Sequence, residues 1–169
     1  MKKPEIGIVM GSDSDWPLVK SAVDVLEDFG LGYEVRVISA HRTPEIAADY
    51  ASSACRRGLK VLISAAGGAA HLGGVIAAHT TLPVIGIPVK DGALNGIDSL
   101  LATIQMPSGI PVATVTLGSA GPKNAAILAV QMLAISRAGL RKKLAGYKEQ
   151  LKEKVKKGNR AVQKDLKKG

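Results

Sequence analysis

The chain has 169 residues, of which 46% are hydrophobic and 22% are charged, and its formal net charge is +9. These values are typical of a folded globular protein rather than a disordered chain, and the length fits one domain with a sizeable core. No stretch approaches the roughly 20 consecutive apolar residues of a membrane span, and the N-terminal residues show no cleavable export signal. We therefore expect a cytoplasmic protein without a membrane partner. The single cysteine, Cys55, cannot form an internal disulfide and fits a reducing compartment.

The positive charge belongs to one end of the chain. Residues 1–136 contain ten Lys and Arg against eleven Asp and Glu, whereas residues 137–169 contain thirteen against three. The lysines are not interleaved with a series of aromatic residues that would stack on bases, so a solvated charged helix is the simpler interpretation. We expect no nucleic-acid partner, and we divide the chain into an α/β domain, residues 1–136, and a basic helical tail, residues 137–169.

Apolar runs alternate with helical patterns along the first 136 residues. In chain order we expect strands at Ile6–Met10, Tyr33–Ile38, Val61–Ala66, Val84–Val89 and Val112–Leu117. We expect helices at Trp16–Phe29, Pro44–Arg57, Ile97–Gln105 and Lys123–Ser136, with a short alanine-rich helix after the glycines at 67 and 68. Strands rich in β-branched residues that alternate with helices predict an α/β fold. The expected architecture is a three-layer sandwich with a doubly wound parallel sheet in flavodoxin-like order and a C-terminal helical extension.

Local signals refine this expectation. Ser14 or Asp15 is expected to cap the first helix, and Thr43 is expected to cap the second, which Gly58 ends. Cys55, in an alanine-rich part of the second helix, is expected to be a small buried residue.

The tail carries a narrow apolar stripe at helical spacing, formed by Leu140, Leu144, Tyr147, Leu151 and Val155. Such a stripe docks either on a neighbouring subunit or on the tail's own domain, and the sequence does not choose between the two.

Polar side chains are concentrated in the loops that follow the first three predicted strands, which read GSDSD, SAHRTP and GGAAHLGG. Ligands of an open parallel sheet bind beyond the carboxyl ends of its strands, and helix N-termini favour anions. The loops therefore predict a site for a phosphorylated small molecule. Arg42, beside Ser39 and a helix start, is suited to a phosphate. Asp15 is either a helix cap or an acceptor for ribose hydroxyls.

The three histidines differ in their surroundings. His41 is the candidate acid/base group, because an unperturbed pKa of ~6.5 lets it give and take a proton. His71 either caps its short helix or orients a ligand, and His79 has no polar neighbours in the sequence, which favours a structural or exposed role. Their spacing is not that of metal ligands, and no dinucleotide or nucleotide motif is present, so we expect no metal and no cofactor.

Several segments, in order, resemble the PurE family: MGSDSDW (10–16), SAHRTP (39–44), AAGGAAHL (65–72), PVIGIPV (83–89), LNGIDSLLATIQMPSGIPVATV (94–115) and KNAAILAVQ (123–131). The resemblance runs from about Ile6 to about Ser136. It implies an isomerase of de novo purine biosynthesis, a mutase that moves a carboxyl group from N5 to C4 of carboxyaminoimidazole ribonucleotide by decarboxylation and recarboxylation. Residues 1–136 are then the catalytic domain. Gly73 departs from the family, which commonly has proline there.

Position by position, the resemblance implies that Ser12, Ser39 and Arg42 contact the phosphate and that Asp15 holds the ribose hydroxyls. The family works without a metal or an organic cofactor. It forms an octamer, in which the C-terminal helix reaches neighbouring subunits.

The resemblance also implies that the loop near Gly67, Gly68, His71 and Leu72 lines the imidazole and its carboxylate, and that His41 transfers the proton. Two alternatives stay open. One is the second type of the family, which carboxylates aminoimidazole ribonucleotide directly with CO2 and usually reads SAHKT where this chain reads SAHRT. The other is a non-catalytic sensor that binds a ribonucleotide through the same loops.

Overall fold

Parallel strands form one sheet in the described part of the chain, residues 2–167 of a computed structural model. Its order is β2-β1-β3-β4-β5. The strands are β1 (Ile6–Met10), β2 (Tyr33–Val37), β3 (Val61–Ala66), β4 (Val84–Pro88) and β5 (Ala113–Thr114). All four neighbouring pairs are parallel. The predicted doubly wound, flavodoxin-like sheet is therefore confirmed.

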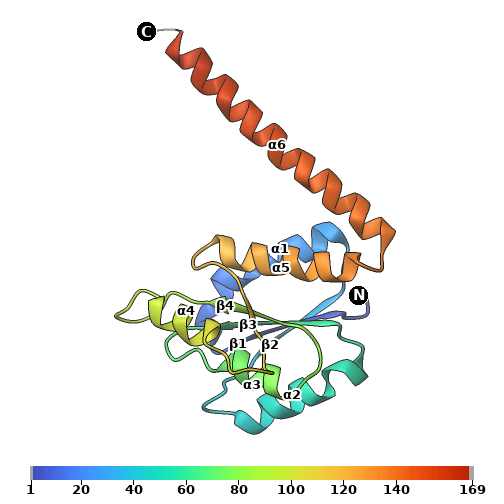
Figure 1. Ribbon diagram of the computed structural model, residues 1–169, viewed down its shortest axis with the longest axis vertical. Helices are drawn as coiled ribbons and strands as arrows, with labels where there is room; N and C mark the ends of the chain where they lie inside the picture. The colour runs from blue at the N-terminus through green and yellow to red at the C-terminus, as the bar shows by residue number, and fades with distance from the viewer. Residues whose placement is uncertain (1, 168–169) are drawn as a thin grey trace. The chain divides into compact units, whose positions relative to one another are not determined.

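Helices cover both faces of the sheet (Figure 1). One face carries α1 (Trp16–Phe29) and α5 (Ala120–Ala134), and the other carries α2 (Pro44–Arg57) and α3 (Leu72–Ala78). A short 3-10 helix, η1 (Asp13–Asp15), precedes α1, and α4 (Ile97–Ile104) packs against β4 and β5. The chain divides between Val130 and Gln131 into two compact units, and α6 (Ala138–Leu166) forms most of the second.

The central strands are buried on both faces, which explains their unbroken apolar sequences. Ile8, Ile63 and Ile85 lie side by side in register across β1, β3 and β4, and none exposes any surface. Burial of each such side chain contributes on the order of 1.5–3 kcal/mol. Val9 and Leu62 belong to the cluster that α2 and α3 cover on the opposite face.

Strand β5 is shorter than the predicted Val112–Leu117, since only Ala113 and Thr114 pair with β4. A continued ladder would bring β5 alongside Pro88, which has no backbone N–H to donate. The strand also lies at the edge of the sheet, so it has a single neighbour to pair with.

Two expectations about α2 were wrong in detail. Thr43 stands at the N-cap position but makes no capping bond, because its hydroxyl donates to the Ser39 carbonyl at 2.9 Å and accepts from the Ser39 N–H at 3.1 Å. Cys55 is exposed rather than buried. The buried face of α2 ends in Ala51 and Ala54, and one further residue rotates the side chain away from it. Gly58 ends the helix as predicted, with φ of 102°.

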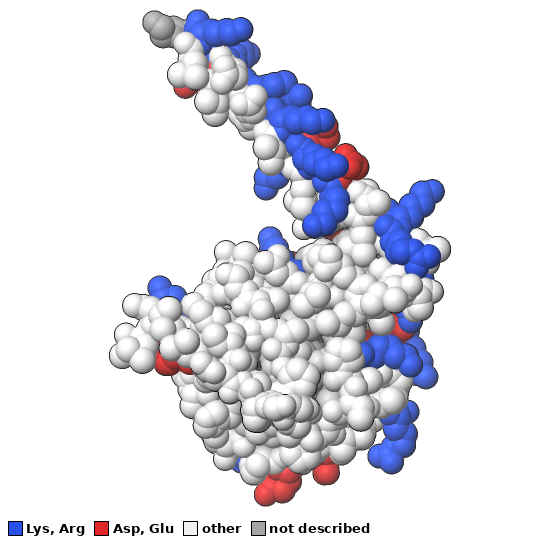
Figure 2. All heavy atoms as spheres, in the orientation of Figure 1, with Lys and Arg blue, Asp and Glu red and all other residues white. Residues whose placement is uncertain are grey.

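The second unit is dominated by α6, a helix of 29 residues along which Lys and Arg side chains gather (Figure 2). Within α6, Leu151 and Val155 of the predicted stripe are exposed, at 42% and 73%. None of the helices in residues 2–167 has both the length and the apolar composition of a membrane span.

Gly86 is a position where the fold requires the absence of a side chain. A Cβ there would overlap the Thr103 side chain of α4 and lie 2.9 Å from Val112 Cγ1. We expect Gly86→Ala to lower the free energy of unfolding by about 1–3 kcal/mol, the usual cost of overpacking. Chemical denaturation measures this. Gly146→Ala is the control, since a Cβ at this α6 position meets nothing within 4 Å. An unchanged stability of Gly86→Ala would contradict the packing described for α4.

Candidate active site

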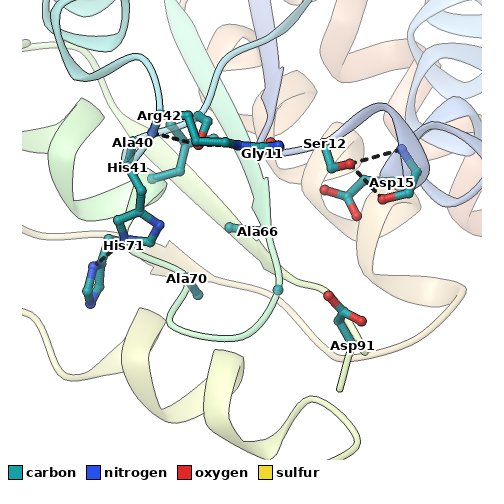
Figure 3. A pocket seen from close by; sticks show the side chains of 14 residues that line it. Gly11, Ser12, Asp15, Ala40, His41, Arg42, Ala66, Ala70, His71 and Asp91 are labelled. Carbon is teal, nitrogen blue, oxygen red and sulfur yellow. Dashed lines mark hydrogen bonds between the residues drawn. The ribbon is translucent and has the colours of Figure 1, made fainter.

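The register of the sheet brings four loops to one edge. Met10 pairs with Val37 and with Ala65, and Ala65 pairs with Ile87, so β1, β2, β3 and β4 end at the same level. The loops beyond these ends enclose a cavity of about 430 Å³ (Figure 3). Its lining consists of Gly11, Ser12, Ser14, Asp15, Ser39, Ala40, His41, Arg42, Ala66, Gly67, Ala70, His71, Leu72 and Asp91.

The residues that the sequence singled out converge on this cavity, with one exception. Ser12, Asp15, Ser39, His41, Arg42, Gly67, His71 and Leu72 all line it. Gly68 does not, although it belongs to the same loop, where its φ of 58° is one that glycine adopts readily. Ala70 of this loop also has a positive φ, 47°, which costs an alanine on the order of 1–2 kcal/mol.

Two histidines from different loops meet in the cavity. His41 precedes α2, and His71 stands at the N-cap position of α3. Nε2 of His41 lies 2.8 Å from Nδ1 of His71, and the rings meet edge to face with centroids 4.9 Å apart. A hydrogen bond at this distance needs one nitrogen that carries a proton and one that does not, so one ring donates and the other accepts. His71 makes no side-chain cap bond to α3, so of the two roles that the sequence left open for it, a helix cap or a ligand contact, the cap is not observed.

Arg42 is fixed at the end of β1. Its Nη2 donates to the Gly11 carbonyl at 3.0 Å, and its Nε donates to Ser39 Oγ at 3.4 Å. Ser39 Oγ also accepts from the Arg42 backbone N–H at 3.2 Å. A guanidinium has five N–H donors, so these two side-chain bonds leave further donors for an anion.

Ser12 organises the start of η1. Its Oγ accepts from the Ser14 backbone N–H at 3.3 Å and from Ser14 Oγ at 2.8 Å, and it donates to Asp13 Oδ1 at 3.3 Å. Ser12 therefore caps η1. Asp15 stands at the N-cap position of α1, one of the two predicted, but its side chain makes no capping bond.

The Asp15 carboxyl lies half-buried in the cavity wall. Burial raises its pKa above the ordinary value, and the negative charges of Asp91 and Asp13 raise it further, against a hydrogen bond from the Ser12 backbone that lowers it. Figure 3 places Asp15 and Asp91 on the side of the cavity opposite His41 and His71. Among the described residues, no three His, Cys, Asp or Glu side chains are grouped as metal ligands.

Asp91 is the cavity residue with a charged side chain that sequence reasoning missed. It lies in the loop between β4 and α4. The signal was available, because the rule that selected the loops after the first three strands applies equally to the loop after the fourth.

The chain is similar to known proteins along most of its length. The model of the AIR carboxylase family matches residues 5–154. The chain is 56% identical to an N5-carboxyaminoimidazole ribonucleotide mutase of Pyrococcus horikoshii, over 91% of this chain and 86% of that protein. It is 52% identical to the protein of the same name from Bacillus subtilis, over 90% of this chain and 94% of that protein.

A solved structure supports the same relationship. The crystal structure of Treponema denticola PurE superposes with a TM-score of 0.81 at 29% sequence identity, and the match covers 91% of this chain and 95% of that one. Because the family model and relatives of more than half identity each span most of its length, this chain belongs to the AIR carboxylase family.

Proposed function

We propose that this chain is an N5-carboxyaminoimidazole ribonucleotide mutase, an isomerase of purine biosynthesis that moves the carboxyl group from N5 to C4. The observation that carries the proposal is a single cavity that combines a histidine pair, a fixed guanidinium and a half-buried carboxylate. The names of relatives at 52–56% identity support the same reaction.

The phosphate of the substrate binds at Arg42 and Ser39. Arg42 is held against Gly11, so its guanidinium is oriented before the ligand arrives, which lowers the entropic cost of binding. Ser12 contacts the same phosphate, and its bond to Asp13 is the one that this contact replaces. Asp15, on the other side of the cavity, accepts hydrogen bonds from the ribose hydroxyls.

His41 transfers the proton. When the bond between N5 and its carboxyl carbon breaks, CO2 leaves without the bonding electrons and N5 takes a proton. When C4 then attacks the CO2, a new carbon–carbon bond forms and the C4 proton must be removed. One proton is given and one is taken, so the reaction has no net proton change, and a histidine is suited to both steps.

His71 can accept that proton from His41. At 2.8 Å between their ring nitrogens, one ring donates a hydrogen bond and the other accepts it, so each ring can pass a proton to the other. A proton accepted by His41 is thereby passed or shared within the pair instead of escaping to water. Gly67, Gly68 and Leu72, on the loop that carries His71, lie beside the imidazole of the substrate.

The released CO2 is retained by the apolar part of the wall. Ala66, Ala70 and Leu72 line the cavity, and an apolar molecule is not displaced from such a wall by competing hydrogen bonds. Confinement beside C4 makes the second step effectively unimolecular, which raises its rate.

The competing function is direct carboxylation of aminoimidazole ribonucleotide with CO2, and the name of the family gives it a specific basis. Arg42 in the SAHRTP segment and the names of the relatives at 52–56% identity favour the mutase. The two activities differ in whether the N-carboxylated compound is consumed or CO2 must be supplied.

Assembly and location complete the proposal. The protein forms an octamer, in which the exposed part of the apolar stripe of α6, at Leu151 and Val155, packs on a neighbouring subunit. Burial of α4 and its preceding loop between subunits is supported by four apolar side chains that are each half exposed or more: Leu94, Ile97, Leu101 and Ile104.

The protein resides in the cytoplasm, and the exposed thiol of Cys55 suits its reducing conditions.

Two variants separate the chemistry from the binding. His41→Asn keeps polarity and approximate size but cannot act as acid or base, so turnover of N5-carboxyaminoimidazole ribonucleotide should fall about 10²- to 10⁴-fold while aminoimidazole ribonucleotide still binds.

Arg42→Lys keeps the charge but loses the paired N–H donors, so KM should rise about tenfold with a smaller effect on kcat. Absorbance assays and isothermal titration calorimetry measure both.

His79→Asn and Arg56→Lys are the matched controls, because both residues are exposed and neither lines the cavity. We expect both to retain native kinetics. Full turnover by His41→Asn would refute the proton-transfer role, and binding without turnover by the native protein would favour the sensor.

For the assembly, sedimentation equilibrium should give a mass near eight times the 17.5 kDa of one chain. Leu101→Asp should reduce that mass, because a charge would be buried at the interface of α4. A native protein that sediments as a monomer would contradict the octamer.

A further inference from the structure

Asp91 brings a second carboxylate into the cavity from a loop that the established motifs do not include. The residue follows β4 by three positions and precedes α4. It lines the same cavity as Asp15, yet no step of the proposed reaction uses it.

The surrounding chain holds this side chain in place. Asp91 Oδ1 accepts a hydrogen bond from the Gly92 N–H at 2.8 Å, and Gly92 has a φ of 66°, in the left-handed region. Gly67 leaves room for the Asp91 side chain, because a Cβ at position 67 would lie 2.9 Å from Asp91 Cβ and 3.5 Å from Asp91 Oδ2. A glycine in the β3 loop therefore permits a carboxylate from the β4 loop.

The position of Asp91 divides the cavity by charge. Asp91 lies near enough to Asp15 for its charge to act on that carboxyl, whereas Figure 3 shows the histidine pair on the opposite side. The anionic phosphate and carboxyl groups of a ligand are repelled from the two carboxylates and drawn toward Arg42. The side at Asp15 and Asp91 suits groups that donate hydrogen bonds.

A ribonucleotide offers two such donors side by side, its 2′ and 3′ hydroxyls. We propose that Asp91 is a specificity residue that, together with Asp15, accepts hydrogen bonds from this diol and thereby selects ribonucleotides over deoxyribonucleotides. This inference rests on the proposed function, because it takes the ligand to be a ribonucleotide. A ligand that lacks one of the hydroxyls loses the hydrogen bonds that this hydroxyl donates to the carboxylates, so it binds more weakly.

The test compares Asp91→Asn with the native protein. Asparagine retains the Oδ1 that accepts from Gly92, so the loop keeps its bond while the charge is lost. The probes are aminoimidazole ribonucleotide and its 2′-deoxy and 3′-deoxy forms, with Kd measured by calorimetry in the presence of EDTA.

We expect Asp91→Asn to bind the ribonucleotide about 10-fold more weakly than the native protein does. For the deoxy form that lacks the hydroxyl bonded by Asp91, the Kd values of the variant and of the native protein should agree within twofold. Asp13→Asn is the control, because Asp13 also acts on the Asp15 charge but does not line the cavity, and its ratio of ribo to deoxy affinity should stay native.

Three results would overturn the inference. Asp91→Asn with native affinity for the ribonucleotide means that Asp91 makes no contact. Equal weakening of the ribo form and of both deoxy forms means a loop effect without selectivity. Ribonucleotide binding that disappears in EDTA and returns with Mg²⁺ means that the two carboxylates hold a cation.

The outcomes also separate this inference from the proposed reaction. Native protein that turns over the N-carboxylated substrate, combined with an unaffected Asp91→Asn, refutes the role of Asp91 alone. Diol selectivity that depends on Asp91 without turnover refutes the mutase alone. Native protein that does not bind the ribonucleotide refutes both.

Discussion

The parallel register of the four strands from β1 to β4 is the constraint on which the site depends. Because Met10, Val37, Ala65 and Ile87 stand at one level, the loops that follow these strands open on the same space. A shift of one residue in one strand would turn its side chains to the opposite face and misplace its loop. The buried isoleucines on one face and the α2–α3 cluster on the other oppose such a shift. The packing of the core therefore fixes the strand register, and the strand register in turn places the loops that form the site.

Within that space the chemistry is separated by position. In the proposed reaction Arg42 binds the phosphate and the histidine pair transfers the proton, while the carboxylates lie on the far side of the cavity. The small residues between them leave room for a ligand and for CO2. Under the proposed reaction, this division keeps the groups that bind the anionic ligand apart from the atoms that lose and regain CO2.

The sequence predicted the strands, the order of the sheet and most of the cavity, because hydrophobic periodicity and loop position at strand ends are local signals. It did not predict contacts that depend on tertiary distance. The meeting of His41 with His71 joins residues 30 apart, and the fit of Asp91 against Gly67 joins two loops. The exposure of Cys55 was also missed, because one residue along a helix changes the face and composition alone does not show which face is buried.

The central claim is that a carboxyl group leaves N5 and returns to C4 of the same ligand without escaping. Its most direct test uses N5-carboxyaminoimidazole ribonucleotide labelled with ¹³C in the N-carboxyl group, in a buffer that contains unlabelled bicarbonate. Mass spectrometry of the C4-carboxy product then reports the origin of the carbon. We expect most of the product to retain the label. A product that carries unlabelled carbon, or that forms only when CO2 is supplied, would contradict the account and indicate the direct carboxylase.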